Sequence, residues 1–158
     1  MAGNSVEIRE EREEDGAFLL RLFALGYGAS MAMLPLAENQ KQAMVEMQWR
    51  AQDAHYRREF AGARFGIVLW EGTPVGRLCV WRGEGQMRVV DAVLLPEWRG
   101  RGIGAAVLEG VLDEARQARC VVRLRVEGWN RARRLYERLG FVEEGEQAGY
   151  VEMVWRPA

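Results

Sequence analysis

The spacing of apolar residues at the start of the chain predicts one strand followed by two helices. Val6 and Ile8 alternate with charged residues, as in a short edge strand. The apolar residues between Phe18 and Leu25 then recur with helical spacing. The pattern over residues 39–60 is also helical, but polar and aromatic side chains interrupt its apolar stripe. Its apolar stripe is the least regular of the predicted helices.

Three β-rich runs occupy the middle of the chain, at residues 65–70, 75–81 and 87–95. The two segments that join them, residues 71–74 and 82–85, are short and have the composition of turns. Neighbouring strands joined by such short turns pair antiparallel. We therefore expect an antiparallel meander of these three runs.

The last third of the chain alternates between helix and strand. Pro96 ends the third β-rich run, and a glycine-rich turn leads into a helix with one continuous apolar stripe. A strand at 121–126, a helix at 130–139 and a closing hairpin at 141–144 and 150–155 follow. The apolar stripe of the first of these helices consists of Ile103, Ala106, Val107, Val111 and Ala115. The full order, a meander and then β-α-β-α-β, indicates a mixed α/β (α+β) fold.

The size and composition fit one globular domain, and we take residues 1–158 as that domain. The chain has 158 residues, of which 49% are hydrophobic, so it can bury a core. With 28% charged residues and a formal net charge of -1, it fits neither a disordered protein nor a generally basic nucleic-acid binder. No apolar run reaches the ~18 residues that span a bilayer, and the acidic N-terminus lacks the pattern of a signal peptide. We expect a cytoplasmic protein without a membrane or nucleic-acid partner.

The two cysteines give no sign of redox or metal chemistry. Cys79 and Cys120 each lie inside an apolar run, and neither has a second Cys or a His at metal-ligand spacing. We expect both to be reduced core residues, and we expect no metal site.

Positive charge is concentrated in one segment of the chain. Between Arg99 and Arg138 there are ten Arg residues against five acids. Such a segment could bind an anion, but it could equally form Arg-rich helix faces exposed to solvent. The composition alone leaves both interpretations open.

The turn at residues 99–104, Arg-Gly-Arg-Gly-Ile-Gly, favours the anion interpretation. It lies between a predicted strand end and a predicted helix start, where unpaired backbone N–H groups and the positive end of the helix dipole meet. Its glycines let the backbone approach a phosphate closely, and Arg99 and Arg101 add positive charge. The alternative is a merely tight turn, which seldom needs three glycines and two arginines together.

Two common phosphate-binding motifs fit this turn poorly. A P-loop requires a Gly-Lys-Ser/Thr ending, which is missing. The dinucleotide-binding fingerprint matches formally at Gly100, Gly102 and Ala105, with Glu127 further on. Its context fails, however, because residues 96–99 separate the strand from the first glycine, and that strand ends a meander. A nicotinamide-binding oxidoreductase therefore remains a minor alternative.

Two segments together resemble the GNAT N-acetyltransferase family. Residues 91–104, Asp-Ala-Val-Leu-Leu-Pro-Glu-Trp-Arg-Gly-Arg-Gly-Ile-Gly, resemble its acetyl-CoA motif, and residues 130–141, Asn-Arg-Ala-Arg-Arg-Leu-Tyr-Glu-Arg-Leu-Gly-Phe, resemble its second motif. The element order resembles the GNAT fold over nearly the whole chain. The resemblance implies a mixed central sheet of about six to seven strands with helices on both faces. It also implies direct transfer of an acetyl group from acetyl-CoA to a primary amine.

The same resemblance implies a binding site for the donor. The pyrophosphate of coenzyme A would lie on the backbone amides of residues 99–104, and the pantetheine arm would pair with the backbone near Leu94 and Leu95. A splay between the strands at 87–95 and 121–126 would make room for it. The residues implied as donor contacts are Leu94, Leu95, Arg99, Gly100, Arg101, Gly102, Ile103, Gly104, Asn130, Arg133 and Tyr136.

Two residues are the candidates for proton transfer. Tyr136 matches the tyrosine of the family, whose phenol is protonated at neutral pH and can protonate a departing thiolate. Asp91 is the first candidate for a general base because it interrupts an apolar strand, where an ionised carboxylate is costly unless paired. The alternative for Asp91 is a structural ion pair with an Arg such as Arg123 or Arg125. Glu127, His55 or an ordered water are the other candidate bases, although alternation places Glu127 on the same strand face as the two arginines, where a surface ion pair would explain it.

The acceptor is the least determined part. The residues that could contact it are Trp49, Gln52, His55, Tyr56, Trp81, Glu127 and Trp129, and core packing would explain most of these aromatics equally well. The acceptor would be a small molecule or peptide with an amine, and nothing in the sequence identifies it. A non-catalytic acetyl-CoA-binding module stays open as an alternative. Pairing of edge strands between subunits could produce a homodimer.

Overall fold

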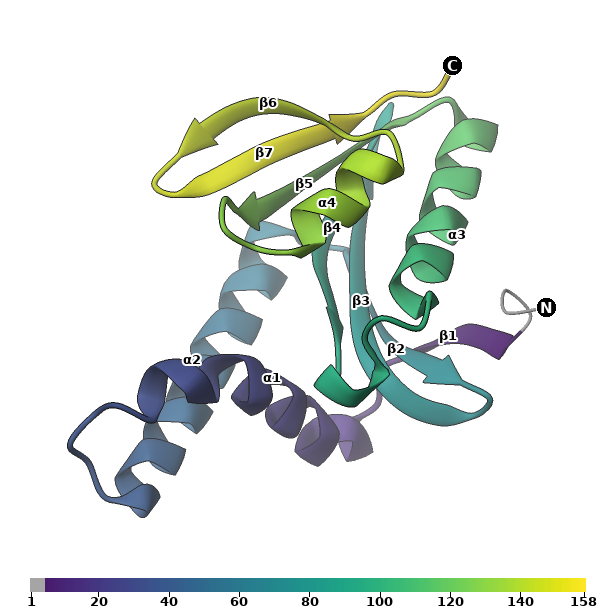
Figure 1. Cartoon of the computed structure of the whole chain (residues 1–158). Coiled ribbons are helices and arrows are strands. Elements are labelled where there is room, and N and C mark those ends of the chain that lie inside the picture. The colour runs from purple at the N-terminus through teal and green to yellow at the C-terminus, as the bar shows by residue number, and fades with distance from the viewer. Residues whose placement is uncertain (1–4) are drawn as a thin grey trace.

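The computed structural model describes residues 5–158, and for residues 28–30 the backbone alone (Figure 1). The elements are β1 (Val6–Glu10), α1 (Gly16–Met31), α2 (Glu38–Glu59), β2 (Arg64–Trp70), β3 (Thr73–Gly83), β4 (Gln86–Leu94), α3 (Ile103–Ala118), β5 (Val121–Glu127), α4 (Ala132–Arg138), β6 (Val142–Gln147) and β7 (Tyr150–Trp155). Two short 3-10 turns, Glu13–Asp15 and Pro96–Trp98, precede α1 and the glycine turn. Every element predicted from the sequence is present, and the strand ends differ from the predicted ones by at most three residues.

The strands form one mixed sheet, as the sequence predicts. Its order is β1-β2-β3-β4-β5-β7-β6 over seven strands. The neighbours β2, β3 and β4 pair antiparallel, which confirms the meander. The strands β4 and β5 are the parallel pair, joined by the crossover through α3.

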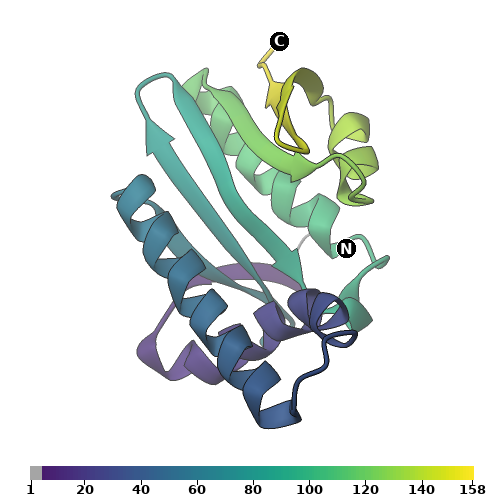
Figure 2. The same ribbon diagram turned by 90° about the vertical axis from the view of Figure 1, so that its left-hand side faces the viewer.

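Helices cover the two faces of the sheet unequally. The helices α1 and α2 lie on one side of the sheet and α3 on the other (Figures 1 and 2). The core beneath α3 and α4 includes the alternate residues Val122, Leu124 and Val126 of β5, which are buried. On the opposite face, α1 and α2 cover the half of the sheet that contains β2 to β4. The intervening residues of β5, such as Arg125, are therefore left at the surface of that face.

The parallel contact between β4 and β5 is short. Their register runs only from Gln86 opposite Val121 to Val89 opposite Leu124. A bulge follows in β4, because Val80 faces Val89 while its neighbour Cys79 faces Asp91. Such a bulge bends a strand and increases its twist. Beyond it β4 continues beside β3 and β5 continues beside β7, so the sheet opens between them.

The two cysteines lie in the core, as the sequence predicts. Cys79 and Cys120 are free thiols and are buried. Within residues 5–158, no helix combines the length and the apolar character that a bilayer crossing requires.

A buried carboxylate fixes the connection between β1 and α1. The Asp15 carboxylate accepts hydrogen bonds from Arg9 Nη1 and Nη2, at 2.8 and 2.7 Å. It also accepts one from the backbone N–H of Arg12, at 2.8 Å. The hydrogen bonds from Arg9 are the main reason why the pKa of Asp15 falls to about 2. This segment thus depends on Asp15 being ionised.

We predict that Asp15→Asn lowers the free energy of unfolding at pH 7 by about 1 to 2 kcal/mol. Because the pKa of Asp15 is lower in the folded than in the unfolded chain, its contribution is present above pH 4 and is lost as the pH falls toward 2. Urea titrations of both proteins at pH 7 and at pH 3 measure the difference. A deficit of the same size at the two pH values would contradict this role of the carboxylate.

Candidate active site

The candidate site is the opening between β4 and β5. The N–H of Leu95 donates to Val75 O at 2.8 Å, so this amide faces β3. Because successive residues of a strand face opposite ways, the N–H and C=O of Leu94 face the opening instead. The Leu94 carbonyl accepts a hydrogen bond from Arg99 Nε at 3.2 Å. Of the two leucines predicted to pair with a ligand arm, Leu94 is therefore the one whose backbone borders the gap.

The glycine turn directs backbone amides toward the end of this opening. Gly100 and Gly102 have φ values of 74° and 83°, a backbone conformation that is energetically costly for residues with a side chain. Gly102 is the N-cap of α3, and the first intrahelical bond runs from Ala106 N–H to its carbonyl at 3.1 Å. The N–H groups of residues 103–105 are thus unpaired at the positive end of a 16-residue helix.

Side chains around the turn also favour the binding of an anion. Arg99 and Arg101 are exposed, and the guanidinium of Arg101 lies 4.9 Å from the centre of the Trp98 ring. Ile103 is buried and anchors the start of α3 in the core. A Cβ placed on Gly104 would lie 3.6 Å from Leu135 Cδ2, an ordinary van der Waals distance, so α3 lies close beside α4 at this point. Amides, positive charge and space meet at one place, as an anion such as a diphosphate requires.

Asn130 connects the end of β5 to the start of α4. Its Oδ1 accepts a hydrogen bond from the backbone N–H of Ala132 at 2.9 Å, which caps the short helix. Its Nδ2 donates to Glu127 Oε2 at 3.0 Å. The surface ion pair proposed for Glu127 from strand alternation is not formed, because Arg123 pairs with Glu144. Arg125 pairs with Glu152 instead.

Arg133 also lies in α4 but points to another part of the chain. Its Nη2 donates to Glu143 Oε2 in β6 at 2.7 Å. Its Nε lies 3.2 Å from Glu137 Oε1. The charge of Arg133 is therefore paired within the protein.

Tyr136 of α4 lies beside the opening and is only 8% exposed. Its ring packs against Phe141, with 5.8 Å between the ring centroids. Burial, and then the negative charges of Asp91 and Glu127, raise the pKa of Tyr136 to about 12. The phenol is therefore protonated at neutral pH, which is the form that a proton donor needs.

Asp91 borders the same opening from β4, just beyond the bulge. Its side chain is 19% exposed, and its Oδ2 lies 3.8 Å from Arg77 Nη1. The ion pair expected with Arg123 or Arg125 is thus replaced by one with Arg77, since those two arginines reach acids of β6 and β7 instead. Burial raises the pKa of Asp91 to about 6, although the charge of Arg77 opposes the rise.

The pair has the properties of a base and an acid. Asp91 is ionised at pH 7 but binds a proton readily, whereas Tyr136 keeps its proton. The two groups influence each other, because the negative charge of the Asp91 carboxylate contributes to the raised pKa of Tyr136. A carboxylate that is ionised and a phenol that is protonated at the same pH can serve as base and acid in one site. The arrangement can deprotonate an incoming nucleophile and protonate a leaving group.

The other residues predicted to contact an acceptor are scattered. Tyr56 of α2 lies near Asp91. Burial is the main cause of the raised pKa of Tyr56, and the negative charge of Asp91 raises it further. Trp49 packs against Phe23, at 5.8 Å between centroids, and belongs to the contact between α1 and α2. Gln52 and Trp81 are partly buried on α2 and β3, and His55 is exposed on α2. Trp129 is 84% exposed in the loop before α4.

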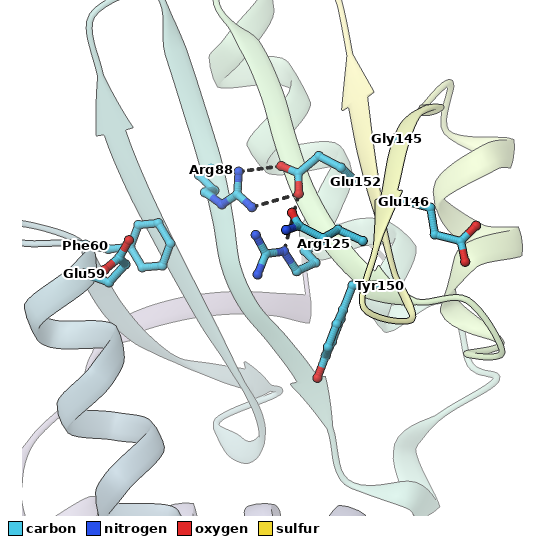
Figure 3. Close-up of a pocket in the computed structure, with 9 residues that line it drawn as sticks. Glu59, Phe60, Arg88, Arg125, Gly145, Glu146, Tyr150 and Glu152 are labelled. Atoms are coloured by element: carbon cyan, nitrogen blue, oxygen red, sulfur yellow. Dashed lines mark hydrogen bonds and ion pairs between the residues drawn. The ribbon is translucent and has the colours of Figure 1, made fainter.

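A cleft on the uncovered face of the sheet was missed from the sequence. It has a volume of about 540 Å³ and extends from the end of α2 across β4 and β5 to the final hairpin (Figure 3). At its floor Arg88 Nη1 and Arg125 Nε contact the two oxygens of Glu152, at 2.7 and 3.5 Å (Figure 3). The lining residues are Glu59, Phe60, Arg88, Arg125, Gly145, Glu146, Gln147, Tyr150 and Glu152.

The cleft begins beside the opening, because Tyr150 of β7 is the register partner of Glu127 at the end of β5. None of the residues predicted to contact an acceptor lines it. The available signal was the charge at alternate positions of β5, Arg123 and Arg125, in a strand with neighbours on both sides. Within residues 5–158, no group of three or more His, Cys, Asp or Glu side chains is arranged to hold a metal ion.

Comparisons with known proteins agree with this geometry. The model of the acetyltransferase (GNAT) family matches residues 30–141. PaiA N-acetyltransferase from Thermoplasma acidophilum, solved in complex with coenzyme A, is 18% identical with a TM-score of 0.71, over 96% of this chain and 99% of that one. An acetyltransferase from Thermus thermophilus is 18% identical with a TM-score of 0.69, over 99% of both chains. Naa50 from Arabidopsis thaliana, in complex with the bisubstrate analogue CoA-Ac-MVNAL, is 20% identical with a TM-score of 0.60, over 95% of this chain and 97% of that one.

The positive φ of Gly102 predicts that substitution by alanine has different effects on stability at Gly102 and at Gly110 of α3. Gly102→Ala should destabilise the fold by about 1 to 2 kcal/mol, because alanine disfavours the φ of 83° at the N-cap of α3. Gly110→Ala, in the exposed middle of α3 where a Cβ meets no atom within 4 Å, should stabilise it by about 1 kcal/mol. Chemical denaturation of the two variants gives both values. Equal effects of the same sign would show that the turn does not hold this conformation.

Proposed function

The chain belongs to the acetyltransferase (GNAT) family, whose model matches residues 30–141, and we propose that the opening between β4 and β5 is its active site, with Asp91 as base and Tyr136 as acid. The protein is an acetyl-CoA-dependent N-acetyltransferase. The observation that carries the proposal is the convergence of Asp91, ionised at pH 7, and Tyr136, protonated at pH 7, on the place where the two strands separate.

The residues present fit acetyl-CoA. The unpaired amides of residues 103–105, with Arg99 and Arg101 beside them, suit its diphosphate. The backbone of Leu94 faces the opening and can hydrogen-bond an extended arm, as an added strand would. Asn130 and Tyr136 are the residues near α4 that would contact the same arm, whereas Arg133 is paired with Glu143 and Glu137. The relative from Thermoplasma acidophilum was solved with coenzyme A, which supports the same assignment for this chain.

The chemistry requires two proton transfers by the protein. Acetyl-CoA supplies the acetyl group as a reactive thioester. Asp91 takes the proton of the attacking amine as the C–N bond forms, and Tyr136 gives its proton to sulfur as the C–S bond breaks. Both residues then exchange protons with solvent, and the products are an amide and a free thiol.

Direct transfer is favoured over an acyl-cysteine route. Burial raises the pKa of the Cys79 thiol, so this residue is a poor nucleophile. Cys120 is also buried. Neither cysteine is therefore suited to carry the acetyl group, and the amine attacks the donor itself.

The acceptor is proposed to be a primary amine of a small molecule or peptide that enters from the side of α2. The cleft of Figure 3 leads from the final hairpin to the opening and offers both charged and aromatic contacts. Tyr56 and Glu127 lie where this path reaches Asp91. The bisubstrate analogue bound to the Arabidopsis relative carries a peptide, which supports an acceptor of this kind.

Three broader assignments belong to the same proposal. Residues 1–158 form one acetyltransferase domain, and the protein acts in the cytoplasm, where its two free thiols stay reduced. The outermost strands of the sheet, β1 and β6, are the edges through which a homodimer would form.

Acetyl-CoA and free coenzyme A should each raise the melting temperature, and NAD should not. Ligand at 100 times its dissociation constant adds about 2.7 kcal/mol to the free energy of unfolding. A scan with the three compounds side by side decides between a coenzyme A site and a nicotinamide site. A panel of amines then separates an enzyme, which shows saturable transfer to at least one amine, from a binding module, which shows only slow hydrolysis.

Tyr136→Phe should lower kcat about 100-fold or more, because it removes the proton donor and keeps the ring that packs on Phe141. Its affinity for acetyl-CoA should stay close to that of the unaltered protein. Tyr27→Phe, in α1 and stacked on Phe23, is a matched control that should leave kcat unchanged. Steady-state kinetics with one amine suffices. Normal turnover in Tyr136→Phe would make Tyr136 a packing residue only.

A further inference from the structure

Arg77 of β3 carries a positive charge inside the protein and has no part in the mechanism described above. It is 2% exposed and lies under α2. Its Nε and Nη1 are buried without a hydrogen-bond partner among the described residues. A buried, incompletely paired guanidinium is costly, so its surroundings must compensate for the charge.

Three carboxylates and two aromatic rings surround this guanidinium. Its Nη2 lies 2.7 Å from Asp53 Oδ1 of α2 and 3.4 Å from Glu11 Oε2, just after β1. The third carboxylate is that of Asp91, 3.8 Å from Nη1. The rings of Trp49 and Phe65 lie 4.9 and 5.1 Å from the guanidinium carbon. Of these groups, only Asp91 borders the opening between β4 and β5.

We propose that Arg77 is a positioning residue for acetyl transfer: it keeps the Asp91 carboxylate ionised and in place, and links that carboxylate to α2 through Asp53. This inference rests on the proposed role of Asp91 as the base. Asp53 and Glu11 hold one edge of the guanidinium, which leaves Nη1 directed at Asp91. A shift of α2 would therefore move the cation that controls the base.

The groups around Asp91 explain why one arginine matters so much. Burial, Glu127 and Asp53 each favour the protonated form of Asp91, whereas Arg77 and the N–H of Ala92 favour the ionised form. The uncharged but titratable groups nearby are Tyr56 of α2, Cys79 of β3 and Tyr136 of α4. Among the groups that act on Asp91, Arg77 is the cation. Without it, Asp91 would hold its proton at neutral pH and could not accept one from the amine.

A neighbouring arginine provides a matched control. Arg57 of α2 contacts the same two acids, Asp53 at 2.9 Å and Glu11 at 3.0 Å. Its guanidinium also lies over the Phe65 ring, at 4.1 Å. It makes no ion pair with Asp91. A loss of packing or of the acidic cluster should affect Arg57 and Arg77 variants alike, whereas control of Asp91 should depend on Arg77.

The test measures the pKa of Asp91 directly and through catalysis. The carboxyl carbon of Asp91 is followed by NMR in protein labelled with 13C-aspartate, and Asp91→Asn identifies its signal. The pH dependence of kcat/KM is measured with one accepted amine. Arg77→Met should raise the pKa of Asp91 by about one to three units. At pH values below that pKa, kcat/KM should fall about tenfold for each pH unit. Arg77→Lys should restore most of the change, and Arg57→Met should leave the pKa in place.

A variant of opposite sign covers the case in which Arg77→Met does not fold. Asp53→Asn removes a negative charge that favours protonated Asp91 and frees Arg77 toward it, so the pKa of Asp91 should fall. An unchanged NMR pKa in Arg77→Met or in Asp53→Asn would overturn the inference, whatever the activity. If instead Asp91→Asn retains the acidic limb of kcat/KM, the base is another group and the proposed function fails at that point.

Discussion

The early end of the parallel pairing between β4 and β5 is the constraint on which the site depends. The two strands share a register only from Gln86 to Val89, after which β4 has a bulge and remains paired with β3 alone. A central strand normally has its backbone groups satisfied on both sides. Here the N–H of Leu94 faces the gap instead, its C=O accepts a hydrogen bond from Arg99, and α3 begins at the end of the gap. The splay thus produces an open backbone edge, a helix N-terminus and room for a ligand in one place.

The charges are arranged around this gap in two layers. Asp91 and Tyr136 border the gap itself, and burial raises the pKa of both groups, to about 6 and about 12. Behind Asp91, the buried Arg77 offsets part of the burial and connects the carboxylate to Asp53 of α2. The network is costly in the interior, where apolar packing would serve stability better. Its retention is understandable if the proton affinity of Asp91 matters to the reaction.

Much of the fold was predictable because its signals are local. Turn composition predicts the meander, and Asn130 indicates the start of α4 from the sequence alone. The glycine turn was equally readable, since positive φ at Gly100 and Gly102 needs that residue type. Ion-pair partners were not readable in this way. Arg77 is a single charge in an apolar run, and its pairing with Asp53 depends on how α2 lies across the sheet. The cleft likewise requires the register of β5 with β7, which no local pattern specifies.

A crystal structure of the protein with coenzyme A tests the central claim most directly. We expect the diphosphate within hydrogen-bond distance of the amides of residues 103–105, with the pantetheine arm beside Leu94 and its sulfur between Asp91 and Tyr136. Coenzyme A bound elsewhere, for example across Arg88 and Arg125 in the cleft, would contradict the assignment of the splay as the active site.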